Sequence, residues 1–178
     1  MRSSTRLATT LALSLALGGL ASDVGASEPG FRILSTDGMT SEAQAHMDKG
    51  DELIAQRRYG RARKEYRAAA DLVREQSDFP AAALYRVAAS YYFEGLYRGA
   101  AKELDKIGAE AADYGDIVVN VWAVADAAWV LGQAGARLDV EKRIKRLQRL
   151  LKSAYLPDEV RDEVTSKRLG LATTLPNS

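Results

Sequence analysis

The chain has 178 residues, with 25 basic side chains, 24 acidic side chains, one histidine and no cysteine. The near balance of charge argues against a dedicated nucleic-acid binder. The lack of cysteine excludes disulfide bonds, so packing alone must hold the fold. A zinc site needs several nitrogen or sulfur ligands, which one histidine cannot supply, so we expect no metal and no cofactor.

Residues 1–26 have the layout of a secretory signal peptide. Arg2 and Arg6 give a positive start, residues 7–21 are apolar or small, and residues 24–26 offer a small-residue cleavage site. The apolar run is shorter than the ~20 residues that span a bilayer, although an uncleaved anchor is the alternative. We therefore predict a periplasmic or secreted bacterial protein, with no integral membrane span after signal cleavage and no acylated cysteine.

Residues 27–40 are predicted to form a flexible or loosely docked leader. Pro29, Gly30 and Gly38 interrupt the segment, and few of its side chains are apolar. The sequence leaves open whether this leader folds back onto the rest of the chain.

Residues 41–170 are predicted to form one all-α domain, followed by a tail at 171–178. Apolar side chains recur at helical spacing, no segment alternates with period two, and Gly or Pro separates successive segments. The predicted helices span residues 41–57, 60–76, 80–94, 97–111, 116–133, 137–154 and 157–170.

A spaced pattern of small and apolar residues occurs three times in this domain. One small residue is followed twelve positions later by a small or β-branched one, and larger apolar residues mostly follow at four and seven positions beyond. Such spacing lets two antiparallel helices cross closely and lets the pair stack on a copy of itself. The three sets are Gly50, Ala62, Tyr66 and Ala69; Ala88, Ala100, Leu104 and Ile107; and Ala128, Val140, Ile144 and Leu147.

This pattern resembles that of tetratricopeptide repeats over about residues 43–150, most clearly between Leu84 and Ile107. The resemblance implies a right-handed α–α superhelix of about three antiparallel helix pairs plus a C-terminal capping helix, which binds rather than catalyses. Ala62 and Ala100 are 38 positions apart, whereas the family repeats every 34 residues. An α–α solenoid of longer period is therefore the alternative.

The resemblance also implies a binding site, because the first helix of each pair lines the concave groove in such stacks. Aligning the second and third pairs through Ala100 and Val140 places polar and aromatic residues of the fifth helix on one face, at i, i+4, i+7 and i+11. Aromatic side chains with a few polar groups in a concave site suit peptide recognition. The predicted partner-binding residues are Tyr85, Arg86, Tyr92, Phe93, Trp122, Asp126, Trp129 and Gln133.

Other interpretations compete with this one. Both tryptophans could pack against the seventh helix or the leader, or the surface could join a homo-oligomer. The basic sixth helix, which includes Arg143, Arg146 and Arg149, favours a rival function as an accessory protein that binds envelope polymer or anionic lipid.

No catalytic set is evident in the sequence. Acidic clusters such as residues 158–163 are typical of solvated helix starts, and His46 has no serine elbow beside it. We predict a non-enzymatic scaffold or adaptor of the bacterial cell envelope, which binds a peptide or a partner helix in an aromatic groove. The sequence does not identify its protein partner, its pathway or its oligomeric state.

Overall fold

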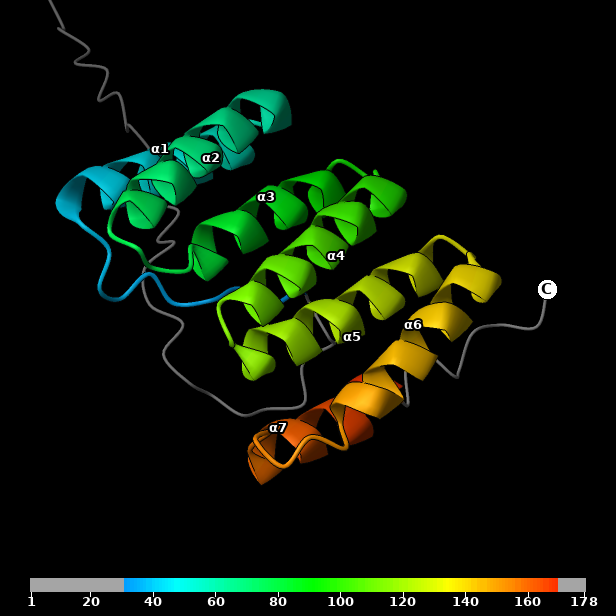
Figure 1. The fold of residues 1–178 in the computed structure, drawn as a ribbon. Helices are drawn as coiled ribbons and strands as arrows, with labels where there is room; N and C mark the ends of the chain where they lie inside the picture. The colour runs from blue at the N-terminus through cyan, green and yellow to red at the C-terminus, as the bar shows by residue number, and fades with distance from the viewer. Residues whose placement is uncertain (1–30, 170–178) are drawn as a thin grey trace, which may run out of the picture.

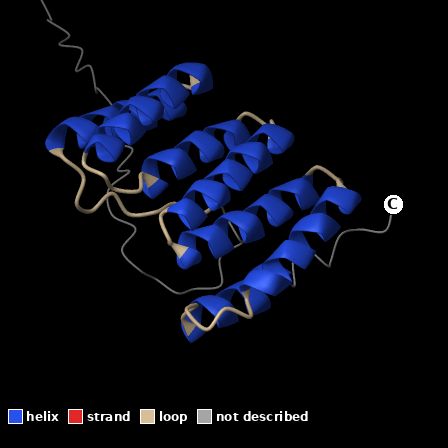
Figure 2. Cartoon of the chain, in the orientation of Figure 1, coloured by secondary structure: helices blue, strands red, loops and turns tan. Residues whose placement is uncertain are grey.

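The computed structural model describes residues 31–169. The predicted signal peptide, the first residues of the predicted leader and the predicted tail therefore lie outside the described residues. Over the described range the chain is all-α, without strands (Figure 2). Its elements are α1 (Ser41–Ala55), α2 (Tyr59–Glu75), α3 (Ala81–Phe93), α4 (Tyr97–Asp113), α5 (Ile117–Gln133), α6 (Arg137–Leu150), α7 (Asp158–Glu163) and a π-helical turn, η1 (Val164–Leu169).

The helices form three antiparallel pairs, α1–α2, α3–α4 and α5–α6, stacked side by side into a right-handed α–α superhelix (Figure 1). The α7 helix and η1 turn back at the C-terminal end of the stack, where η1 contacts α5 (Figure 1). The predicted fold class is therefore confirmed, and the first six predicted helices are present with ends within a few residues of the prediction. The seventh, predicted for residues 157–170, is a short α-helix that ends at Glu163 and continues as the π-helical η1. None of the described helices combines the length and the apolar character that crossing a membrane requires.

The helix ends follow from local chemistry. The side chains of Thr40 and Asp116 accept hydrogen bonds from the backbone amides of Ala43 and Val119, which caps the starts of α1 and α5. Gly95 and Gly135 follow α3 and α5 in the left-handed region, with φ of 80° and 65°, where a side chain would be strained. These turns are short, so the two helices of each pair remain neighbours.

The first pair is joined by a close approach between α1 and α2. Tyr66 is fully buried, and its ring lies so near Gly50 that an added Cβ would be 2.2 Å from Cε1. The Tyr66 hydroxyl donates a hydrogen bond of 2.6 Å to Asp51, which also pairs with Arg86 of α3 at 3.2 Å. Burial, and then the hydrogen bond to Asp51, raises the pKa of Tyr66. We call Asp51, Tyr66 and Arg86 the stack network, since it links α1, α2 and α3.

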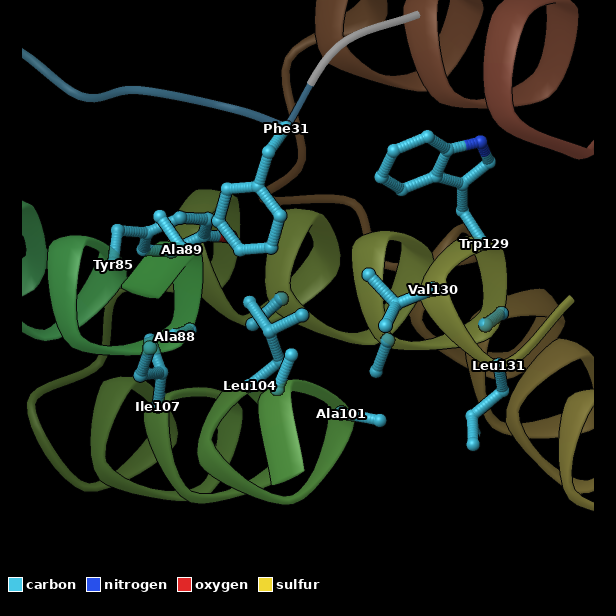
Figure 3. Close-up of a cluster of buried hydrophobic side chains, with 14 of the residues drawn as sticks. Phe31, Tyr85, Ala88, Ala89, Ala101, Leu104, Ile107, Trp129, Val130 and Leu131 are labelled. Carbon is cyan, nitrogen blue, oxygen red and sulfur yellow. The ribbon is translucent and has the colours of Figure 1, made fainter. Parts of the chain in front are cut away.

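The main core lies between α3, α4 and α5, where small side chains let the helices approach. Leu104 and Ile107 of α4 fill the space opposite Ala88 of α3 and Val130 of α5 (Figure 3). A separate cluster holds the C-terminal elements on the stack, with Val121, Val124 and Ala125 of α5 packed against Leu147, Leu156 and Val164. Burial of apolar surface of this kind contributes roughly 25 cal/mol per Å², so both clusters stabilise the order of the stack.

Candidate functional site

The described part of the leader lies across α3 and α5. Residues 31–36 have no regular secondary structure, and Phe31 points from them toward these two helices, on the side away from α4 (Figure 3). Phe31 is 8% exposed, with its ring centroid 6.4 Å from that of Tyr85 and 5.4 Å from that of Tyr92. We call the surface of α3 and α5 beneath residues 31–36 the α3–α5 face. It belongs to the first helices of the second and third pairs, as the predicted groove does.

Tyr92 is the centre of an aromatic cluster on this face. Its ring lies 5.3 Å from Trp129 of α5, 5.7 Å from Phe93 and 5.6 Å from Tyr97. Contacts of this length between tilted rings add to the stabilisation that their burial already gives. The cluster therefore ties α3 to α5 directly beneath the leader.

Arg32 makes the polar half of the same contact. Its guanidinium carbon lies 4.4 Å from the centroid of the Trp122 ring, within the range of a cation–π interaction. Its Nε lies 3.2 Å from Oδ2 of Asp126, and its Nη2 donates a 2.6 Å hydrogen bond to Glu163 of α7. We call Arg32, Trp122, Asp126 and Glu163 the leader network.

The charge of Asp126 explains why Arg32 binds here. Asp126 is only 1% exposed, and a buried carboxylate is costly unless a cation or hydrogen-bond donors face it. Burial by itself lowers the pKa of Arg32, but the charge of Asp126 and the hydrogen bond to Glu163 together raise it above its ordinary value. The guanidinium therefore stays charged and compensates both carboxylates.

The structure brings five of the eight predicted partner-binding residues together beneath the leader and places Phe93 at the edge of the aromatic cluster. The other two, Arg86 and Gln133, lie apart from the site. Arg86 turns to Asp51 of α1, and Phe93 is half exposed at the end of α3. Gln133 is exposed at the last position of α5. The five that meet beneath the leader are Tyr85, Tyr92, Trp122, Asp126 and Trp129.

Three important residues of the site were not predicted from the sequence. Phe31 and Arg32 lie in the leader, and Glu163 lies in the acidic cluster that the sequence predicts to be a solvated helix start. The available signal is that the apolar side chains of the leader gather at Phe31, Ile33 and Leu34, around Arg32. The structure also answers the open question about the leader, since residues 31–34 fold back onto the stack.

A separate cleft of about 340 Å³ lies farther along the leader. Leu34 lies at its edge, and Phe79 and Val73 contribute apolar walls near the turn between α2 and α3. Asp78 and Gln76 add polar groups to the lining. The cleft therefore lies between the leader, the end of α2 and the start of α3, beside the α3–α5 face.

The basic α6 helix offers less free charge than its sequence indicates. Arg143 pairs with Asp105 of α4, and its Nη1 donates to the backbone oxygen of Asp139 at 3.0 Å. Arg146 donates to Oδ1 of Asn120 in α5 at 3.2 Å. These arginines hold α6 against the stack, which leaves fewer cations for an anionic polymer or membrane.

Within the part of the chain that the structure describes, no group of three or more His, Asp or Glu side chains could hold a metal ion. The His46 Nδ1 lies 2.8 Å from Oε2 of Glu65, so this histidine links the surfaces of α1 and α2.

Comparison of the chain with protein-family models, curated proteins and solved structures gives no match. The resemblance to tetratricopeptide repeats therefore rests on the residues quoted above, and the site must be judged on its own geometry.

Proposed function

We propose that this protein is a non-catalytic interaction module, which binds an extended polypeptide segment on its α3–α5 face. One observation carries the proposal. The face already holds such a segment, since Phe31 is buried against Tyr85 and Tyr92 while Arg32 lies on Trp122 and pairs with Asp126. The layout of residues 1–26 supports a role as a scaffold or adaptor in the bacterial cell envelope.

The composition of the face suits this task. Buried aromatic side chains supply most of the energy at peptide sites, and a single anchor can contribute about 2 kcal/mol. A charged pair adds little net affinity but fixes the register and direction of the segment. Here the ring pocket for Phe31 and the carboxylate of Asp126 accept neighbouring residues, so the two contacts together define one register.

The leader acts as a tethered competitor in this proposal. A segment joined by a short linker has an effective concentration on the order of millimolar at its site, so it stays docked even when its intrinsic affinity is weak. A partner must then bind with better contacts, with a longer footprint or at high local concentration. The cleft beside Leu34 is lined partly by the leader itself, so a partner segment that displaces the leader would also meet its other walls on α2 and α3.

The rival function, binding of envelope polymer or anionic lipid through α6, has less support. Arg143 and Arg146 already contact Asp105 and Asn120. The rival must therefore rely on Arg149 and the other exposed basic side chains of the helix. Strong salt dependence of binding would favour it over the aromatic face.

A peptide-binding experiment tests the proposed function. The full chain carrying Phe31→Ala and Arg32→Ala, in which the leader is loosened, is titrated against a fluorescein-labelled synthetic peptide with the sequence of residues 29–38. We expect an affinity in the micromolar range, at least about tenfold weaker binding to wild type, and a similar loss when Trp129→Ala is added.

Two controls accompany the titration. Leu138→Ala changes an exposed side chain on α6 and should leave binding unchanged, and circular dichroism checks that every variant is folded. If the folded double variant does not bind the peptide, or if Trp129→Ala has no effect, the α3–α5 face is not a peptide site.

A further inference from the structure

The three partners of Arg32 come from elements outside the leader. Trp122 and Asp126 belong to α5, and Glu163 ends α7. The C-terminal elements are held on α5 by a separate apolar cluster, in which Val164 packs against Val121 and Val124. An aromatic face and two carboxylates are thus held ready for one guanidinium, whichever chain supplies it.

From this arrangement, and on the basis of the proposed function, we propose the class of ligand. It is an extended segment in which an aromatic residue is followed directly by an arginine. One solvent-facing residue and then an aliphatic residue come after the arginine. The leader is the built-in example. Phe31 and Arg32 are buried or nearly so, Ile33 is 51% exposed, and Leu34 packs against the main core.

Arginine fits this position better than lysine for geometric reasons. A guanidinium is planar, so it can lie on the Trp122 ring while its edge reaches Asp126 and Glu163 together. A lysine ammonium is a compact and strongly hydrated charge, which cannot stack in this way. The spacing of the three partners around Arg32 therefore selects arginine among the basic residues.

The same carboxylates exclude other ligands. A neutral residue in place of arginine would take away the cation that faces the buried Asp126, and loss of a charged hydrogen-bond partner in a buried site is costly. An acidic residue would be repelled by Asp126 and Glu163 together. Specificity at this site is therefore set by charge and by planarity, whereas the aromatic pocket supplies affinity.

A series of labelled peptides tests the ligand class on the full chain carrying Phe31→Ala and Arg32→Ala. The parent peptide has the sequence of residues 29–38, and its variants replace Arg by Lys, Gln or Glu, replace Phe by Ala, exchange Phe and Arg, or replace Ile by Ala. We expect the affinity to fall about fivefold when Arg is replaced by Lys, and more than about tenfold when it is replaced by Glu. Replacement of Arg by Gln, replacement of Phe by Ala and exchange of Phe and Arg should each lower the affinity at least about tenfold. The Ile variant should bind as the parent does, because Ile33 faces outward.

A variant on the receptor side checks that the carboxylates cause the preference. Glu163→Gln keeps the shape of the side chain and should reduce the preference for Arg over Gln by about fivefold. Glu159→Gln on the exposed side of α7 is the matched control and should change nothing. An unchanged preference in Glu163→Gln would overturn the assignment of this residue to the site.

The outcomes separate the two proposals. If all peptides bind equally, the ligand class is wrong while the face remains a peptide site; if none binds to the folded variant, the proposed function falls and the ligand class with it. Light scattering adds a further outcome. If the wild type is a dimer and the variant carrying Phe31→Ala and Arg32→Ala is a monomer, the face binds the leader of a second copy. That result would overturn the proposal that the ligand belongs to a different protein.

Discussion

The stack network and the leader network both centre on an arginine that binds a carboxylate, yet they hold different things together. Every member of the stack network lies in one of the helices α1 to α3. In the leader network the arginine comes from a non-helical segment, and its partners come from α5 and α7. Disruption of the first should weaken the stack as a whole, whereas disruption of the second should release one segment.

The carboxylate that joins three helices is more exposed than the carboxylate that holds the leader. The side chain of Asp51 is 43% exposed although it joins three helices, whereas Asp126 is 1% exposed although its arginine is on the leader. Water can solvate Asp51 if Arg86 moves, but water has little access to the carboxylate of Asp126. A deeply buried carboxylate under a removable segment is what a selective binding site would need.

The largest expected effect is on the seam beside the stack network. Gly50→Ala should lower the free energy of unfolding by about 2 kcal/mol, because the new Cβ would overlap the buried ring of Tyr66. Urea unfolding followed by circular dichroism measures the change. Gly60→Ala is the control, since its Cβ would meet only Arg63 at 3.7 Å and should leave stability equal or higher. Equal effects at both glycines would mean that the α1–α2 seam can relax.

The second largest expected effect is on hydrogen exchange, which distinguishes the two networks. Arg32→Met should weaken docking of the leader by about 1.5 kcal/mol, because the cation facing Asp126 is lost. Hydrogen exchange should then rise by roughly tenfold in the amides of residues 33–39, with little change in α1 to α4. Arg86→Met should instead raise exchange across α1 to α3. If Arg32→Met raises exchange throughout α3 and α5, the leader is an inseparable part of the core.

Much of the fold could be predicted, because helix pairs leave a periodic record in the sequence. The pairing of Tyr66 with Gly50 follows from such spacing, as does the face that carries Trp122 and Trp129. These contacts involve residues that recur at fixed distances along the chain. The physical cause is the helix itself, which places side chains three and four positions apart on one side.

The rest could not be predicted, because it depends on single contacts between distant parts of the chain. Arg32 contacts Asp126 and Glu163, which lie far away in the sequence. No periodic pattern indicates these contacts, because they form only when the tertiary structure is complete. Arg86 shows a second limit. It follows Tyr85 directly, and a step of one residue turns about 100° around a helix, so Tyr85 lies beneath the leader while Arg86 reaches α1.

A smaller effect concerns the hydroxyl of Tyr66. Tyr66→Phe removes the hydrogen bond to Asp51 and should cost about 1 kcal/mol near neutral pH. The raised pKa of Tyr66 gives this variant a distinct pH profile. The folded state favours the protonated phenol, so its contribution is complete below the ordinary pKa of about 10 and is lost as pH rises above it. Unfolding measured across that range should show wild type losing more stability than Tyr66→Phe, and parallel profiles would contradict the shift.

The smallest effect belongs to an ion pair that lies outside both networks. Arg137 pairs with Glu141 at 3.3 Å on α6, but the arginine side chain is 79% exposed and both groups are well solvated. Exposed pairs of this kind contribute little, so Arg137→Ala should change the free energy of unfolding by less than about 0.5 kcal/mol and leave exchange in the leader unchanged. Urea unfolding and hydrogen exchange, run beside Arg32→Met, measure both. If the two variants gave equal changes in stability and exchange, burial would not determine how much an ion pair contributes. The leader network would then be no different from an exposed ion pair.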